Sequence, residues 1–324
     1  MNVRRSLPRV SLIPLLVAAV LTALLVTVSA SPAFSKVRPQ DDHATMPRKC
    51  VKPKDLIPAQ PTICELNTFK DTRPTVVLWG DSHAWMMIPA LRRATGNKNV
   101  NLVAIVLGGC PPMDNQIQPD DQAPSCFKSN DMAIRYVREL KSQGQGMRVI
   151  LAGSWQRYLH AIKAHDKTYT GTMAREMRTG TPRLMRTLAG IGLGVDVIGQ
   201  VATVPEKKAD CRAGNLPYSC NLPIRKAMPE KKSTRQWLVK TIRPLAGNRA
   251  PIDVTPFFCT SKVCHGKVGR THTWWDDLHL SASMSQRLRG YLKPSVEKAI
   301  ADRPTEPATS PSGGCTIPIL GIPC

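Results

Sequence analysis

The chain has 324 residues, enough for one large or two small domains, and its 42% hydrophobic and 21% charged residues are ordinary for a globular protein with a sizeable core. Lys and Arg number 45 against 23 Asp and Glu, and the formal net charge of +22 favours anionic partners. The chain has no recognisable nucleic-acid-binding motif, which excludes nucleic acid and leaves anionic lipid or an acidic envelope polymer.

The first thirty residues have the pattern of a signal peptide or a membrane anchor. Three arginines precede an almost purely apolar run over 12–28, and small residues follow, so we expect cleavage after Ala30. The run is nearly long enough to span a bilayer, and an uncleaved anchor is the alternative. Both readings predict an exported protein, secreted or anchored at the outer face of the cytoplasmic membrane. No second apolar run has spanning length.

Ten cysteines agree with export. They occur as close neighbours, and an even number of cysteines in an oxidising compartment indicates disulfides. Metal ligation is the rival interpretation, but the chain has no C-x-x-C pair of the kind that zinc sites use. Pairing each cysteine with its neighbour is the simplest arrangement. It gives Cys50–Cys64, Cys110–Cys126, Cys211–Cys220, Cys259–Cys264 and Cys315–Cys324.

Between a linker (31–70) and a Pro-rich tail (303–324), residues 71–302 form the predicted folded domain. Short apolar runs alternate there with helical patterns, which requires crossover connections between parallel strands. We therefore predict an α/β fold with a doubly wound, mostly parallel five-stranded sheet and helices on both faces. Candidate strands are 75–79, 100–107, 148–152, 195–201 and 252–258. Candidate helices are 83–95, 128–142, 173–190, 232–244 and 283–300.

The first candidate strand, VVLW, ends at Gly-Asp-Ser-His, so that Ser82 lies where open α/β sheets bind their ligands. A serine becomes a nucleophile when an imidazole takes its proton, and a carboxylate must orient that imidazole. Asp276 and His279 lie three apart in WWDDLHLSAS, just before the last helix, for which Ser283 and Gln286 predict a capping box. Alone, Gly-Asp-Ser is commonly a turn or a helix cap, and Asp-x-x-His is commonly a solvated loop.

Taken together, these motifs resemble a known superfamily. GDSH ends the first strand, DDLHLS precedes the last helix, and nearly the whole domain lies between them. This arrangement resembles the SGNH (GDSL-like) hydrolase superfamily. GDSHAWMMIPAL, GGCPPM and WWDDLHLS resemble more narrowly the SGNH domain fused to membrane-bound acyltransferases that O-acylate surface polysaccharides. The resemblance covers roughly residues 70 to 300 and implies a flavodoxin-like SGNH fold.

The resemblance implies a role for each residue of a catalytic triad. Ser82 would be the nucleophile, His279 the general base and Asp276 the carboxylate that orients it. Asp277 is adjacent and is the alternative carboxylate, although the spacing of the family favours Asp276. The resemblance implies no cofactor and no metal.

The implied oxyanion hole has two backbone donors, the N–H of Ser82 and that of Gly109, with Gly108 as a less favoured alternative. The usual third donor of the superfamily is the Asn of Gly-x-Asn. This chain has LAGSWQRY instead, so Gly153 is followed by Ser154 and Trp155 and the third donor is left open.

Other residues near these motifs have two interpretations each. His83 either shapes the pocket or makes a local hydrogen bond at a helix start. Trp155, Trp274 and Trp275 either form a sugar-stacking wall or pack their loops onto the sheet. The basic segment 224–243 is either a solvated helix face or a surface that holds an anionic envelope polymer.

The expected function is an exported serine acyl-transfer enzyme, an O-acyl esterase or O-acetyltransferase, acting on cell-envelope glycans through an acyl-serine intermediate. The acyl group would come from the glycan itself or from a separate membrane acyltransferase. One alternative is a non-catalytic glycan-binding module. Another is a metallophosphoesterase using Asp81 and His83, for which the histidines outside the two motifs provide no ligand pattern.

Overall fold

The computed structural model describes residues 38–114, 124–162, 171–204, 220–247 and 250–302. The predicted signal peptide or anchor, the Pro-rich tail, Cys211 and the Cys315–Cys324 pair lie outside these ranges. Within them, no helix has the length and apolar character that a membrane crossing requires.

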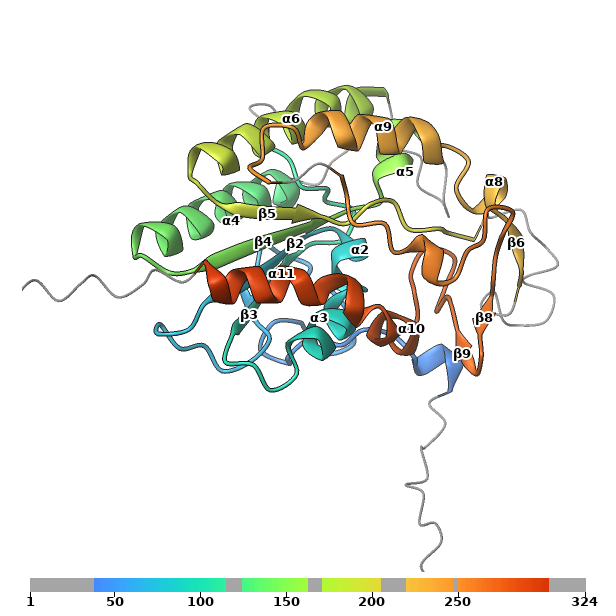
Figure 1. Cartoon of the computed structure of the whole chain (residues 1–324), viewed down its shortest axis with the longest axis horizontal. Coiled ribbons are helices and arrows are strands. Elements are labelled where there is room, and N and C mark those ends of the chain that lie inside the picture. Colours follow the sequence, from blue (N-terminus) through green and yellow to red (C-terminus); the bar gives the residue numbers. More distant parts are fainter. Residues whose placement is uncertain (1–37, 115–123, 163–170, 205–219, 248–249, 303–324) are drawn as a thin grey trace, which may run out of the picture. The chain divides into compact units, whose positions relative to one another are not determined.

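A five-stranded sheet with helices on both faces forms the centre of the domain (Figure 1), which confirms the predicted doubly wound α/β fold. The strand order is β1-β3-β2-β4-β5; β1 runs antiparallel to β3, and the other pairs are parallel. The strand that ends at Gly-Asp-Ser is β2, at the middle of the sheet. The strands are β1 (Cys64–Glu65), β2 (Thr75–Gly80), β3 (Asn101–Val106), β4 (Met147–Ala152) and β5 (Gly194–Val197).

Every residue of β2 is buried, because helices cover both faces of the sheet. Val76 and Leu78 pack on one face with α3, α10 and α11, whereas Val77 and Trp79 pack on the other with α4, α6 and α9. The helices are α2 (Ser82–Trp85), α3 (Ile88–Thr95), α4 (Pro124–Ser142), α5 (Trp155–Leu159), α6 (Gly171–Gly190), α8 (Ile224–Ala227), α9 (Lys231–Thr241), α10 (Ala282–Arg287) and α11 (Arg289–Ala301). Two short antiparallel pairs join β6 (Leu222–Pro223) to β7 (Val263–Cys264) and β8 (Lys267–Val268) to β9 (Thr271–His272).

Part of the predicted linker belongs to the folded domain. Within 38–70, β1 adds a strand to the edge of the sheet beside β3, and Ala44 is 1% exposed in the core. The Asn67 side chain bonds the backbone of Val100 and Leu102. Pro and charged residues in this segment are typical of a linker. Its few apolar residues nevertheless pack in the core, and the Cys50–Cys64 bridge ties its first part to β1.

The predicted strand at 252–258 is wrong. Ile252 forms one isolated parallel bridge with Ile198, and the chain then enters a 3-10 helix at Thr255–Phe257. The Asp253 carboxylate accepts the Thr255 N–H at 3.0 Å, and this local bond turns the chain out of the sheet. The fifth strand of the sheet is therefore β1.

The N-cap of α10 also differs from the prediction. Ser281, not Ser283, accepts the Met284 N–H at 3.0 Å, so α10 begins two residues earlier than the capping box indicates. The predicted last helix is divided at Leu288 into α10 and α11.

Three of the predicted cysteine pairs are disulfides in the structure, with S–S distances of 2.03 to 2.07 Å. They are Cys50–Cys64, Cys110–Cys126 and Cys259–Cys264. Cys220 is also disulfide-bonded, and its predicted partner lies outside the described residues. No described cysteine is free.

The end of β2 requires a glycine. Gly80 has a φ of 154°, and a Cβ atom placed on it would lie 1.8 Å from the carbonyl oxygen of Ala152, its neighbour in β4. This oxygen belongs to the backbone of a central strand and cannot move aside cheaply. Gly80 therefore allows β2 and β4 to stay paired up to the residue before Asp81.

We expect Gly80→Ala to lower the free energy of unfolding by about 3 kcal/mol or more, because the overlap is with backbone. Gly190→Ala is the matched control: nothing lies within 4 Å of its Cβ position, and we expect a change within about 1 kcal/mol. Urea unfolding of both variants measures the difference. Equal stability of the two would contradict this account of the turn.

Candidate active site

The turn from β2 into α2 is organised by the buried carboxylate of Asp81. Its Oδ1 accepts the His83 N–H at 2.7 Å, and this bond caps α2. Its Oδ2 accepts the Ser154 N–H at 2.9 Å and the Tyr158 hydroxyl at 2.6 Å, both from the segment after β4. Asp81 therefore fixes Ser82, the first residue of α2, relative to the neighbouring strand.

His83 follows Ser82 and is buried, with 2% exposure. Both of its ring nitrogens are buried and form no hydrogen bond with a described residue. Burial lowers the pKa of His83 to about 4, against the opposing effect of the Asp81 charge, so the ring is neutral near pH 7. The expected local hydrogen bond is made by its backbone N–H and not by its ring.

The loop between β9 and α10 brings Asp276 and His279 together. Both carboxylate oxygens of Asp276 lie within hydrogen-bond distance of His279 Nδ1, at 2.9 and 2.8 Å. Asp276 Oδ1 also accepts the backbone N–H groups of Leu278 and His279, at 2.8 and 2.7 Å. Burial alone would raise the pKa of Asp276, but these bonds and the charge of His279 lower it below its ordinary value.

His279 lies against the helix that begins with Ser82. Its ring centroid is 5.5 Å from that of Trp85 and 5.7 Å from that of His83, both on α2. The next residue, Leu280, donates its N–H to the sulfur of Met86 at 3.3 Å. These contacts bring the two sequence motifs to one place. His279 Nε2 is buried and forms no hydrogen bond with a described residue.

The N-terminal segment holds the same loop from the other side. The Trp275 indole N–H donates to the Gln40 carbonyl at 2.8 Å, and the Asp42 carboxylate accepts both the backbone N–H and the hydroxyl of Ser283. His43 packs edge-on against Trp275, with ring centroids 5.1 Å apart. Sequence reasoning missed these residues because they lie in a segment that reads as a linker.

Asp277 is not the carboxylate that contacts His279 Nδ1. It is 8% exposed, and its backbone carbonyl accepts the Val204 N–H at 2.7 Å. The residue therefore helps to join the loop to the segment after β5.

The loop after β3 carries Gly109. The Cys110 N–H donates to the Leu107 carbonyl at 3.1 Å, and within this turn Gly109 has a φ of 71°, a conformation that favours glycine. The Cys110–Cys126 disulfide ties the loop to α4. The Asn130 amide, also on α4, reaches the Pro111 carbonyl at 3.1 Å.

Two of the three tryptophans proposed as a sugar-stacking wall are core residues. Trp155 and Trp274 are each 0% exposed, and their indole N–H groups donate to backbone carbonyls of Ile198 and Ala202. Trp275 is partly exposed and lies beside His279, with ring centroids 6.2 Å apart. Trp275 therefore belongs to the site together with Trp85, which the sequence analysis did not single out.

Two backbone donors of the segment after β4 are already engaged. The Ser154 N–H is bonded to Asp81, and the Gln156 N–H is bonded to the Gln200 side chain at 2.8 Å. Across the ranges that the structure describes, no group of three or more His, Cys, Asp or Glu side chains could hold a metal ion.

Comparisons with known proteins agree with this arrangement. The family model "SGNH domain (fused to AT3 domains)" matches residues 49–294. The periplasmic domain of a Salmonella ser. Paratyphi A lipopolysaccharide acetyltransferase is similar in fold, with a TM-score of 0.51 at 15% identity over 70% of this chain and 85% of that one. A carbohydrate acetylesterase family member from Sinorhizobium meliloti gives a TM-score of 0.38 at 15% identity, over 70% and 99% of the two chains. A comparison with curated proteins gave no match.

The buried ring of His83 predicts a loss of stability in acid. The unfolded chain takes up a proton on this residue as the pH falls below about 6.5, whereas the folded protein resists until about pH 4. The free energy of unfolding therefore falls through this interval, by about 3 kcal/mol. His83→Leu removes the titrating group, and we expect its urea-unfolding free energy to fall less than that of the wild type between pH 7 and 4. An identical fall in both proteins would contradict the neutral, buried state of His83.

Proposed function

The chain belongs to the family of SGNH domains that occur fused to AT3 domains, and from this premise we propose that it is an exported serine acyl-transfer enzyme acting on cell-envelope glycans. The observation that carries the proposal is the bond of both Asp276 oxygens to His279 Nδ1, beside the helix that begins with Ser82. A carboxylate in this position fixes the tautomer of the imidazole, so that Nε2 carries a lone pair.

The proposed chemistry has two steps. His279 Nε2 takes the proton of the Ser82 hydroxyl while Ser82 Oγ attacks the carbonyl carbon of the acyl group. The proton then passes to the departing alkoxide, and an acyl-Ser82 ester is left. Water or a sugar hydroxyl next attacks this ester, again losing its proton to His279. The proton then returns from His279 to Ser82 Oγ as the acyl–Oγ bond breaks, which releases the acid or the new sugar ester and restores the free serine. Water makes the protein an O-acyl esterase, and a sugar hydroxyl makes it an O-acyltransferase.

The tetrahedral intermediate of each attack carries an oxyanion, for which we assign two donors. The backbone N–H groups of Ser82 and Gly109 form no hydrogen bond with a described residue, so both are available. Gly109 is held in place by its turn and by the neighbouring disulfide. Fixed donors of this kind stabilise charge as it develops and need no reorganisation.

The compartment and the substrate class have independent support. Disulfides persist in oxidising compartments, and the described cysteines are all paired. The Salmonella neighbour is the periplasmic domain of a lipopolysaccharide acetyltransferase, which favours an O-acetyl group on an envelope glycan. Since this family occurs fused to AT3 domains, a separate membrane acyltransferase is the acyl donor that we propose for the transferase direction.

Labelling by a fluorophosphonate probe tests the nucleophile. We expect the wild type to be labelled once, and Ser82→Ala and His279→Ala to lose both the label and aryl-acetate hydrolysis by orders of magnitude, since the members of a triad act as a unit. Ser142→Ala is the control serine, at the exposed C-terminal end of α4. A folded wild type that is never labelled would favour a non-catalytic glycan-binding module.

The two adjacent carboxylates give a sharper test of the loop. We expect Asp276→Asn to reduce turnover by about 10⁴-fold, because the imidazole loses its orienting carboxylate and counter-charge. Asp277→Asn should stay within about tenfold of the wild type, a barrier change of about 1.4 kcal/mol. Both are measured on one aryl ester after circular dichroism confirms the fold. The reverse ranking would remove Asp276 from the proposed triad.

A further inference from the structure

Helix α9 has one buried face and one strongly basic face. Thr234, Leu238 and Thr241 are buried on the side that packs on the domain. The exposed residues of the opposite side include four cations, which we call the basic face of α9. They are Lys232, Arg235, Lys240 and Arg243, and they lie together on an open surface that also includes Gln236 and Val239.

The cations of the basic face have no ion-pair partner among the described residues: none of the four lies within 4 Å of a carboxylate there. A second basic cluster lies where α3 meets α11 and consists of Arg93, Lys98, Arg289 and Lys293. It differs in this respect, because Lys98 and Lys293 both pair with Glu297. Like charges three or four residues apart on a helix repel each other by about 0.2–0.5 kcal/mol per pair. An anionic ligand along the basic face would reverse that repulsion.

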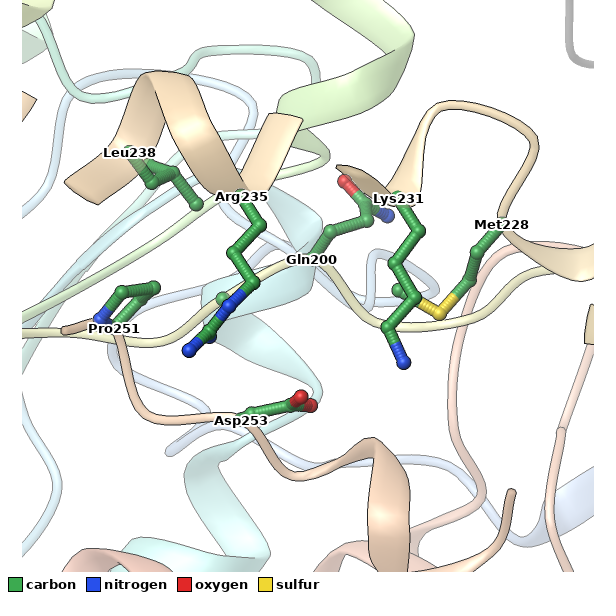
Figure 2. A pocket seen from close by; sticks show the side chains of 8 residues that line it. Gln200, Met228, Lys231, Arg235, Leu238, Pro251 and Asp253 are labelled. Carbon is green, nitrogen blue, oxygen red and sulfur yellow. The ribbon is translucent and has the colours of Figure 1, made fainter. Parts of the chain in front are cut away.

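The basic face continues toward the proposed active site. Arg235 also lines a small hollow of about 20 Å³ with Lys231, Gln200 and Asp253. Figure 2 shows the Lys231 and Arg235 side chains extending from α9 into this hollow, with Asp253 on the opposite side. Asp253 accepts hydrogen bonds from Thr255, so its charge is partly engaged within its own loop.

The chain segment 154–156 contacts both Gln200 of this hollow and the turn that carries Ser82. Gln200 accepts the N–H of Gln156 on α5, and the nearby Ser154 N–H donates to Asp81, which precedes Ser82. The basic face thus begins at the same end of the sheet as the proposed active site, where the parallel strands have their carboxyl ends.

We propose that the basic face of α9 binds an anionic glycan, one with carboxylate groups along its chain, and that this polymer is the one whose acyl groups reach Ser82. The second part of this proposal, that the same polymer carries the acyl groups, rests on the proposed function. A lipid surface fits less well, because α9 buries its apolar side and the exposed large apolar side chains of the described residues, Ile63 and Ile300, lie elsewhere. Lysine and arginine heads spaced along a helix match charges spaced along a polymer.

The test measures binding of fluorescently labelled polygalacturonate to the full chain, with neutral dextran of equal length beside it. The basic-face variant carries K232Q, R235Q, K240Q and R243Q. The control variant removes the same total charge from the second basic cluster by R93Q, K98Q, R289Q and K293Q. We expect the wild type to bind polygalacturonate and not dextran, and to bind more weakly as salt rises. The basic-face variant should lose about tenfold or more in affinity, and the control variant about twofold or less.

The outcomes separate this inference from the proposed function. Equal losses in the two variants would mean that net charge alone binds the polymer, and no loss in either would mean that another surface does; both overturn the inference. Phosphatidylglycerol vesicles bound in a manner dependent on the basic face would assign it to a membrane and overturn it as well. Fluorophosphonate labelling of the same wild-type preparation is scored separately. A labelled protein without polygalacturonate binding retains the serine chemistry, and an unlabelled protein that binds retains only the glycan surface.

Discussion

The structure depends most on one buried carboxylate, that of Asp81. A buried charge is costly unless it is hydrogen-bonded, and Asp81 accepts three hydrogen bonds from two chain segments. One segment is the start of α2, and the other is the turn that follows β4. The carboxylate therefore joins β2 and β4 at the end of the sheet, next to Gly80, which has no side chain to keep the two strands apart. Ser82 is placed by this pair of constraints.

The loop with Asp276 and His279 is held by parts of the chain that lie far from it in sequence. Trp274 anchors it to the segment after β5, and Leu280 anchors it to α2. The N-terminal segment closes it from outside through Gln40 and Asp42. A hydrogen-bonded pair three residues apart needs such support, because a short loop by itself would leave both side chains solvated. The N-terminal segment is therefore part of the machinery that positions the site.

The surroundings of His279 are aromatic, and the surface farther out is basic. Trp85, Trp275 and His43 pack around the imidazole or one another, and the neutral ring of His83 adds no charge near pH 7. The unpaired cations of α9 act at longer range, where they affect which polymer approaches rather than how its ester bond reacts. The residues around His279 thus affect the reaction itself, whereas the cations of α9 affect binding of the polymer.

The sequence alone determined the α/β class, the central place of the strand before Gly-Asp-Ser and the pairing of three disulfides, because alternating apolar runs, turn residues and cysteine spacing are local signals. It also singled out Ser82, Asp276 and His279 as residues of one site. Only the tertiary structure decided that residues 38–66 join the domain, that β1 and not 252–258 completes the sheet, and that Trp155 and Trp274 are core while Trp85 and Trp275 adjoin His279. Such outcomes depend on contacts between residues far apart in the chain, such as Asp42 and Ser283. The free energy of these contacts cannot be predicted from a local sequence pattern.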